Sequence, residues 1–109
     1  MAELLFPVEF HNEIPETPEN LLPLQQEVET HLAKLAQGND DISNVIVNVK
    51  RPAQGRNTPY VHEITIMVYM DGENVVVNEK GELLDGTLRK ALDVMDRQVR
   101  TQREKRRGL

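Results

Sequence analysis

The stretch VHEITIMVYM-DG-EN-VVVN at residues 61–78 decides the fold of this chain. Isoleucine and valine alternate with other residues across 61–70, as they do in a strand with one buried face. Asp71-Gly72 follows and favours a type I′ turn, because both central residues of that turn need positive φ. A second strand is expected at residues 74–78. The segment therefore predicts a β-hairpin.

Three further elements are predicted before this hairpin. Residues 42–50 alternate with valines on one side, which indicates another half-buried strand, and a long connection at 51–60 links it to the hairpin. Residues 4–10 predict a short strand, and its Pro7 suits an edge position or a strand start. Residues 20–37 predict a helix with Pro23 in its first turn and Gly38 as its stop. Its buried stripe is expected to consist of Leu21, Leu24, Val28, Leu32 and Leu35.

The C-terminal part predicts a second helix, from about residue 83 to beyond Arg100. Residues 101–109 form a basic tail with little apolar surface to bury, so this tail can stay flexible. The predicted order β-α-β-β-β-α is typical of an α+β fold, one four-stranded sheet with both helices packed on a single face. The apolar stripe of the second helix is expected to consist of Leu84, Leu88, Leu92, Met95 and Val99.

Length and composition restrict the class of protein. The chain has 109 residues, which suits one compact domain over 1–109. No apolar run approaches the roughly 18–20 residues that cross a bilayer, and residues 1–10 lack the features of a signal peptide. The sequence contains no cysteine, so disulfides, cysteine zinc sites and thiol nucleophiles are excluded. We therefore expect a cytoplasmic protein without a membrane segment.

Charge is segregated along the chain. Residues 1–49 contain nine acidic residues and one basic residue, and residues 50–85 contain six acidic and four basic residues. Residues 86–109 contain eight basic and three acidic residues, although the whole chain has a net charge of −5. The C-terminal part is therefore the candidate partner for a polyanion. Its basic residues are Arg89, Lys90, Arg97, Arg100, Arg103, Lys105, Arg106 and Arg107.

Two interpretations of these bases remain open. Cations near a helix C-terminus stabilise the helix by about 0.3 to 1 kcal/mol each, so one or two would need no other explanation. Six bases between Arg97 and Arg107 exceed that need. Phosphate binding is therefore favoured over a role in solubility alone.

The sequence contains no motif typical of an enzyme. It has no glycine-rich phosphate loop, no nucleophile elbow and no pair of histidines at metal-ligand spacing. His11, His31 and His62 are scattered, and surface or structural roles suit them better than metal binding. We expect no cofactor, no metal and no small-molecule substrate. With only two Phe and two Tyr, a stacking platform for single-stranded nucleic acid is disfavoured, whereas backbone contacts to folded RNA remain possible.

The C-terminal half carries two motifs, GELLDGTL at residues 81–88 and LDVMDRQVR at 92–100. Through them the chain resembles the family of ribosome hibernation promoting factors and ribosome-associated inhibitor A, also called the sigma-54 modulation protein family. Family members have GEDMYAAI and VDKLERQIR at the corresponding places. Weaker similarity covers residues 32–35, 42–49 and 62–63, and the resemblance is to the short form of the family.

The resemblance implies a fold similar to double-stranded RNA binding domains and a partner, the small ribosomal subunit with its ribosomal RNA. Members of the family lodge near the decoding centre and hold the ribosome inactive during stress, without catalysis. By position, the resemblance implies ribosomal RNA contacts from Lys34 in the first helix and from Arg97, Arg100, Arg103, Lys105, Arg106 and Arg107.

A second hypothesis is a protein-binding module of the same fold that no longer binds ribosomes. The acidic first half motivates it and predicts a basic protein partner. The oligomeric state is left open by the sequence.

Overall fold

The computed structural model describes residues 6–13, 18–37, 41–50, 62–106 and 108. The predicted order β-α-β-β-β-α is confirmed, and the fold is α+β. The elements are β1 (Val8–Asn12), α1 (Pro18–Ala36), β2 (Ile42–Lys50), β3 (His62–Met70), β4 (Val75–Gly81) and α2 (Leu84–Arg106).

The four strands form one mixed sheet in the order β1-β2-β3-β4. β1 is parallel to β2, and the other neighbouring pairs are antiparallel. Pro7 directly precedes the edge strand β1, and its carbonyl accepts a hydrogen bond from the Val45 amide at 3.1 Å. This placement agrees with the prediction for Pro7, because the missing N–H costs nothing at a strand start.

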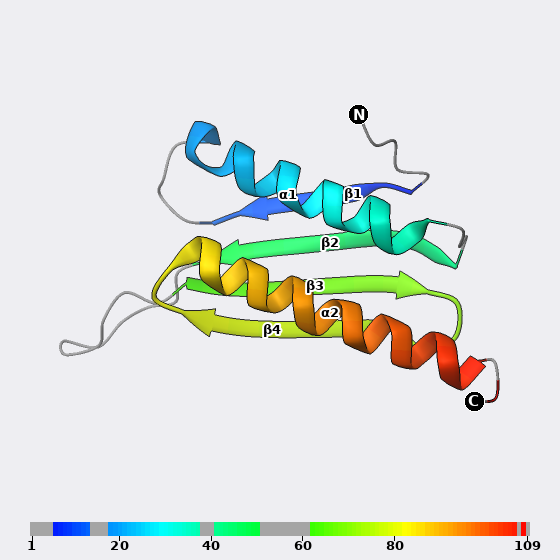
Figure 1. Ribbon diagram of the computed structural model, residues 1–109. Helices are drawn as coiled ribbons and strands as arrows, with labels where there is room; N and C mark the ends of the chain where they lie inside the picture. The colour runs from blue at the N-terminus through cyan, green and yellow to red at the C-terminus, as the bar shows by residue number, and fades with distance from the viewer. Residues whose placement is uncertain (1–5, 14–17, 38–40, 51–61, 107, 109) are drawn as a thin grey trace.

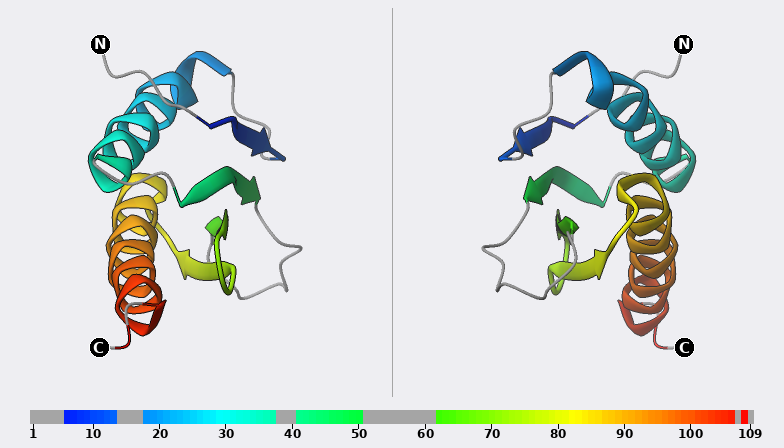
Figure 2. Two further views of the ribbon diagram at one scale, coloured as in Figure 1. Left: turned by 90° about the vertical axis from the view of Figure 1, so that its right-hand side faces the viewer. Right: turned by 90° about the vertical axis from the view of Figure 1, so that its left-hand side faces the viewer.

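Both helices cover the same face of the sheet, as predicted. Figure 2 shows the two layers from the ends, with α1 beside β1 and β2 and α2 beside β3 and β4. The helices run in the same direction, so their C-terminal ends lie at one end of the molecule (Figure 1). Neither helix, within the residues described, is long and apolar enough to cross a membrane.

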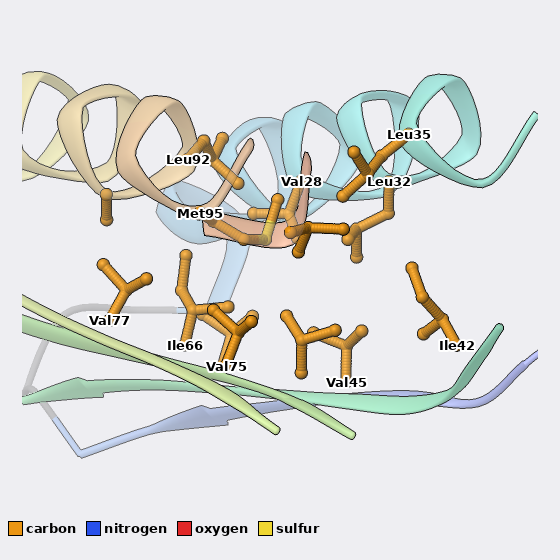
Figure 3. Close-up of a cluster of buried hydrophobic side chains, with 14 of the residues drawn as sticks. Val28, Leu32, Leu35, Ile42, Val45, Ile66, Val75, Val77, Leu92 and Met95 are labelled. Carbon is orange, nitrogen blue, oxygen red and sulfur yellow. The ribbon is translucent and has the colours of Figure 1, made fainter. Parts of the chain in front are cut away.

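A continuous apolar core lies between the sheet and the helices (Figure 3). The strands point alternate residues into it, so the period-2 pattern of the sequence is confirmed. Both predicted helical stripes are buried as well, except that Leu24 and Leu84 are only partly buried and the Leu21 side chain lies outside the described part. Fully buried side chains include Val28, Leu32, Val45, Val47, Ile64, Ile66, Val68, Leu88, Met95 and Val99.

The connection between β3 and β4 differs from the predicted type I′ turn. Four residues, 71–74, join the strands instead of two. Gly72 has a φ of 86°, but Asp71 does not have positive φ, so the type I′ assignment is wrong. The Asn74 side-chain oxygen accepts a hydrogen bond from the Met70 amide at 3.3 Å and closes the wider loop.

The helix ends also differ from the sequence-based boundaries. α1 begins at Pro18, two residues early, so Pro23 lies inside the helix and not in its first turn. α2 continues to Arg106, and Gln102 is only 8% exposed, so residues 101–106 are helical and partly packed. The predicted stop at Gly38 and the connection at 51–60 lie outside the described residues.

Gly81 permits the close approach of β4 and the first turn of α2. A Cβ atom at Gly81 would collide with the Thr87 side chain, whose hydroxyl donates to the Leu83 carbonyl at 2.6 Å. We expect Gly81→Ala to lower the free energy of unfolding by about 1–3 kcal/mol, because overpacking displaces this turn. Urea denaturation measures the change.

Gly86→Ala is the matched control. Its new Cβ would lie 3.9 Å from the Leu83 Cβ, an ordinary contact, and Gly86 is a helical position without positive φ. This change should stabilise the protein by about 0.4–1 kcal/mol. Equal effects of the two substitutions would contradict the steric argument.

Candidate RNA-binding surface

The predicted RNA contacts occupy both helices. Lys34 lies near the end of α1, and all the other predicted contacts that the structure describes lie on α2. Arg107 is outside the described residues. The eight described side chains divide into those with acidic partners and those without.

Arg89 and Lys90 are exposed and paired with acidic residues. Arg89 Nε lies 3.1 Å from Glu27 on α1, and Arg89 also lies 3.7 Å from Asp85. Lys90 Nζ lies 3.7 Å from Glu79 on β4. Exposed pairs of this kind contribute roughly 0–1 kcal/mol to stability. The paired carboxylates offset the positive charge that Arg89 and Lys90 present to a phosphate.

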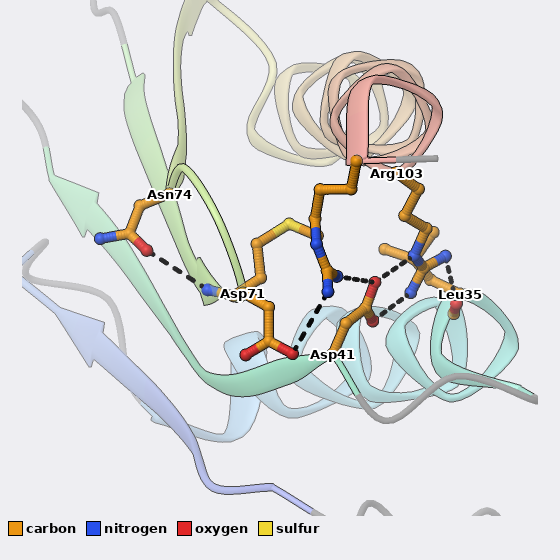
Figure 4. Close-up of polar contacts among 7 residues, drawn as sticks. Leu35, Asp41, Asp71, Asn74 and Arg103 are labelled. Atoms are coloured by element: carbon orange, nitrogen blue, oxygen red, sulfur yellow. Dashed lines mark hydrogen bonds and ion pairs between the residues drawn. The ribbon is translucent and has the colours of Figure 1, made fainter. Parts of the chain in front are cut away.

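Arg103 is held differently, since its side chain is only 11% exposed. Its Nε and Nη2 donate to the two carboxylate oxygens of Asp41 at 2.7 and 2.9 Å, and its Nη1 donates to the Leu35 carbonyl at 3.0 Å (Figure 4). The hydrogen bonds from Arg103 lower the pKa of Asp41, although burial opposes this shift. Arg103 is therefore committed to contacts within the protein.

Arg106 reaches the same acidic site from the last turn of α2. It lies 4.0 Å from Asp41 and 3.8 Å from Asp71, in the connection between β3 and β4. Its side chain is 42% exposed. Arg106 therefore keeps part of its surface available to solvent, unlike Arg103.

Four predicted contacts are exposed and, among the described residues, have no ion-pair partner. At 1.5 Å per residue, the three on α2 extend over about 12 Å of the helix, and at 100° per residue they occupy an arc of about 140° opposite the buried stripe. The outer face of α2 thus presents three cations without ion-pair partners among the described residues, and the same arc also carries the exposed carboxylates of Asp93 and Glu104. The four residues, called the free cations below, are Lys34, Arg97, Arg100 and Lys105.

Contacts between the helices bring Lys34 towards this surface. Nε2 of His31 is buried and lies 2.9 Å from Asp96, close enough for an ion pair but outside hydrogen-bond geometry. Lys34 falls one turn after His31, and Arg100 one turn after Asp96, so both follow this contact along parallel helices. The end of α1 and the C-terminal half of α2 therefore supply the free cations together.

Among the residues that the structure describes, the opposite face of the sheet offers less free charge. Its Lys50 and Lys80 both pair with Glu63, at 3.6 and 3.8 Å. A hydrogen bond from Asn78 at 3.0 Å, together with the lysines, lowers the pKa of Glu63 and keeps it ionised. This face is therefore less suited to phosphate than the helical face.

Sequence reasoning missed the acidic partners of α2. Asp41 is 62 positions away from Arg103, and no local pattern connects them. Asp71 was interpreted only as a turn residue. Spacing along a helix shows which cations share a face, but it does not show which carboxylates fold against them.

The fold matches solved structures. A ribosomal subunit interface protein from Coxiella burnetii aligns with a TM-score of 0.65 and 12% identity, over 88% of this chain and 96% of the other. The Protein Y N-terminal domain from Thermus thermophilus aligns with a TM-score of 0.55 and 21% identity, over 86% of this chain and 92% of the other. No curated protein matches the chain in sequence. The sequence profile described as sigma 54 modulation protein / S30EA ribosomal protein matches residues 22–107.

Proposed function

Because the chain belongs to the sigma 54 modulation protein / S30EA ribosomal protein family, we propose that it binds the small ribosomal subunit and inhibits translation. The proposed site is the outer face of the two helices, which meets ribosomal RNA. The proposed location is the cytoplasm, near the decoding centre of the ribosome, under stress or in stationary phase.

The observation that carries this proposal is the group of free cations on the helical face. A protein that neutralises phosphates releases condensed counterions, and this release drives binding to RNA. The net charge of −5 does not oppose it, because the local field at the surface decides association, and only three of the 18 acidic residues lie within residues 86–109.

The side chains on this face favour recognition of RNA shape. The described aromatic rings are Phe6, which is buried, Phe10 and Tyr69, which are partly buried. None of them lies on the helices, so bases have no Phe or Tyr ring to stack on there. Arginine and lysine can instead follow the phosphates of a folded RNA without reading its sequence. The proposed role requires no catalytic group.

The salt dependence of ribosome binding tests the proposal. Each phosphate contact contributes about −0.7 to −0.9 to the slope of log K against log salt, so four free cations predict a slope of about −3. The affinity should fall about 100-fold between roughly 50 and 200 mM salt. Co-sedimentation with purified small subunits over this range measures the slope.

The slope also separates the free cations from the whole predicted set. Eight contacts from all the described candidates would give about −6 to −7. Absence of salt-sensitive pelleting would reject the proposal itself.

The alternative of a protein-binding module is supported by exposed acidic side chains, including Glu29, Glu73 and Glu82. A basic protein could bind them. A pull-down from nuclease-treated lysate distinguishes the two functions. One stoichiometric protein without ribosomal components would favour the alternative.

A further inference from the structure

The C-terminal ends of the two helices meet at a node of charged groups (Figure 4). Arg103 of α2 binds Asp41, which precedes β2, and the carbonyl of Leu35 near the end of α1. The Asp71 amide donates to the Asp41 carbonyl at 2.8 Å, and the Asp71 carboxylate lies 3.8 Å from Arg106. The node therefore ties α2 to α1, to the start of β2 and to the connection between β3 and β4.

We propose that Arg103 is a positioning residue for the RNA-binding surface and does not itself contact RNA. It fixes the last turns of α2 so that Arg100 and Lys105 keep their places relative to Lys34. This inference rests on the proposed function and defines which of the predicted bases act directly.

Burial and hydrogen bonding support the assignment. The side chains of Arg103 and Asp41 are 11% and 10% exposed, and three guanidinium N–H groups are already used. A phosphate contact would require Arg103 to leave Asp41, and a buried carboxylate would then lack its partner. The exposed cations on the same helix can bind phosphate without that cost.

The node also neutralises an end of the molecule that would otherwise repel RNA. Helix C-termini carry partial negative charge, and both helices end here beside Asp41 and Asp71. Arg103 and Arg106 compensate this charge. Their effect on RNA is therefore indirect and depends on their acidic partners.

Removing the acidic partner gives opposite results for the two possible roles. If Arg103 positions α2, Asp41→Asn should weaken binding to purified small subunits and speed amide hydrogen exchange in residues 97–106. If Arg103 contacts RNA, Asp41→Asn should release it and tighten binding. Asp93→Asn is the control, because it removes an exposed carboxylate of α2 and should tighten binding slightly.

Salt slopes of charge-neutral double variants provide the second measurement. Asp41→Asn/Arg103→Gln should weaken binding and leave the slope unchanged, whereas Asp93→Asn/Arg100→Gln should reduce its magnitude by about one. All variants are the full chain, and circular dichroism verifies that they are folded at the assay temperature.

The proposal is overturned if the folded Asp41→Asn protein binds as tightly as wild type or more tightly. It is also overturned if the slope of log K against log salt for Asp41→Asn/Arg103→Gln decreases in magnitude by about one. If wild type does not pellet with small subunits, the proposed function fails. Unchanged hydrogen exchange in residues 97–106 of Asp41→Asn would then still refute the positioning role.

Discussion

Neutralising the three free cations of α2 is expected to weaken binding to the small ribosomal subunit by about 100- to 500-fold at about 0.1 M salt. The variant is Arg97→Gln/Arg100→Gln/Lys105→Gln. Each lost phosphate contact removes its counterion release, and the slope of log K against log salt should fall in magnitude by about 2 to 3. Co-sedimentation at several salt concentrations measures both quantities. The fold should be unaffected, because all three side chains are exposed.

A control with the same change in net charge separates local from global electrostatics. Lys50→Gln/Arg89→Gln/Lys90→Gln also removes three positive charges, but from residues paired with carboxylates. Its binding should fall much less than that of the α2 variant. Equal losses would show that binding follows net charge and not the proposed surface.

Arg103→Met is expected to lower the free energy of unfolding by about 3–5 kcal/mol and the melting temperature by more than about 10 °C. The substitution leaves the Asp41 carboxylate 10% exposed and without its bidentate partner. Arg100→Met changes an exposed residue of the same helix and should stay within about 0.5 kcal/mol of wild type. Urea denaturation at pH 7 provides the comparison.

The double variant Asp41→Asn/Arg103→Met should recover part of the loss, because no unpaired charge remains. A double variant as unstable as Arg103→Met would show that lost packing of the Arg103 side chain, and not the unpaired Asp41 carboxylate, causes the loss of stability.

The stability difference should also depend on pH. The pKa of Asp41 lies below its ordinary value of 3.8 in the folded protein, mainly through the hydrogen bonds from Arg103. A depressed pKa contributes stability above the unfolded value, and this contribution is lost as the pH falls through the folded pKa. The difference in the free energy of unfolding between wild type and Arg103→Met should therefore be largest at neutral pH and become smaller below about pH 4. Glu63, whose pKa is also lowered, is present in both proteins, so its contribution to the pH dependence cancels in the comparison.

Alternation and helical spacing were sufficient to predict the element order. Val45 and Val47 share a face because side chains of a strand alternate, whatever the rest of the chain does. Turn geometry was less predictable: Asp71-Gly72 permits a type I′ turn, but the Asn74 side chain stabilises a four-residue connection instead. The resemblance carried by residues 81–88 and 92–100 agrees with the family match.

The sequence by itself determined which apolar stripes are buried and where the bases are concentrated, because periodicity and charge are local properties of the chain. Only the tertiary structure decided which bases are free. Arg100 and Arg103 are three residues apart on one helix, yet one is exposed and the other is bound to Asp41. The reason is physical: an ion pair depends on a partner that folding brings from 62 positions away, and no spacing within the helix encodes it.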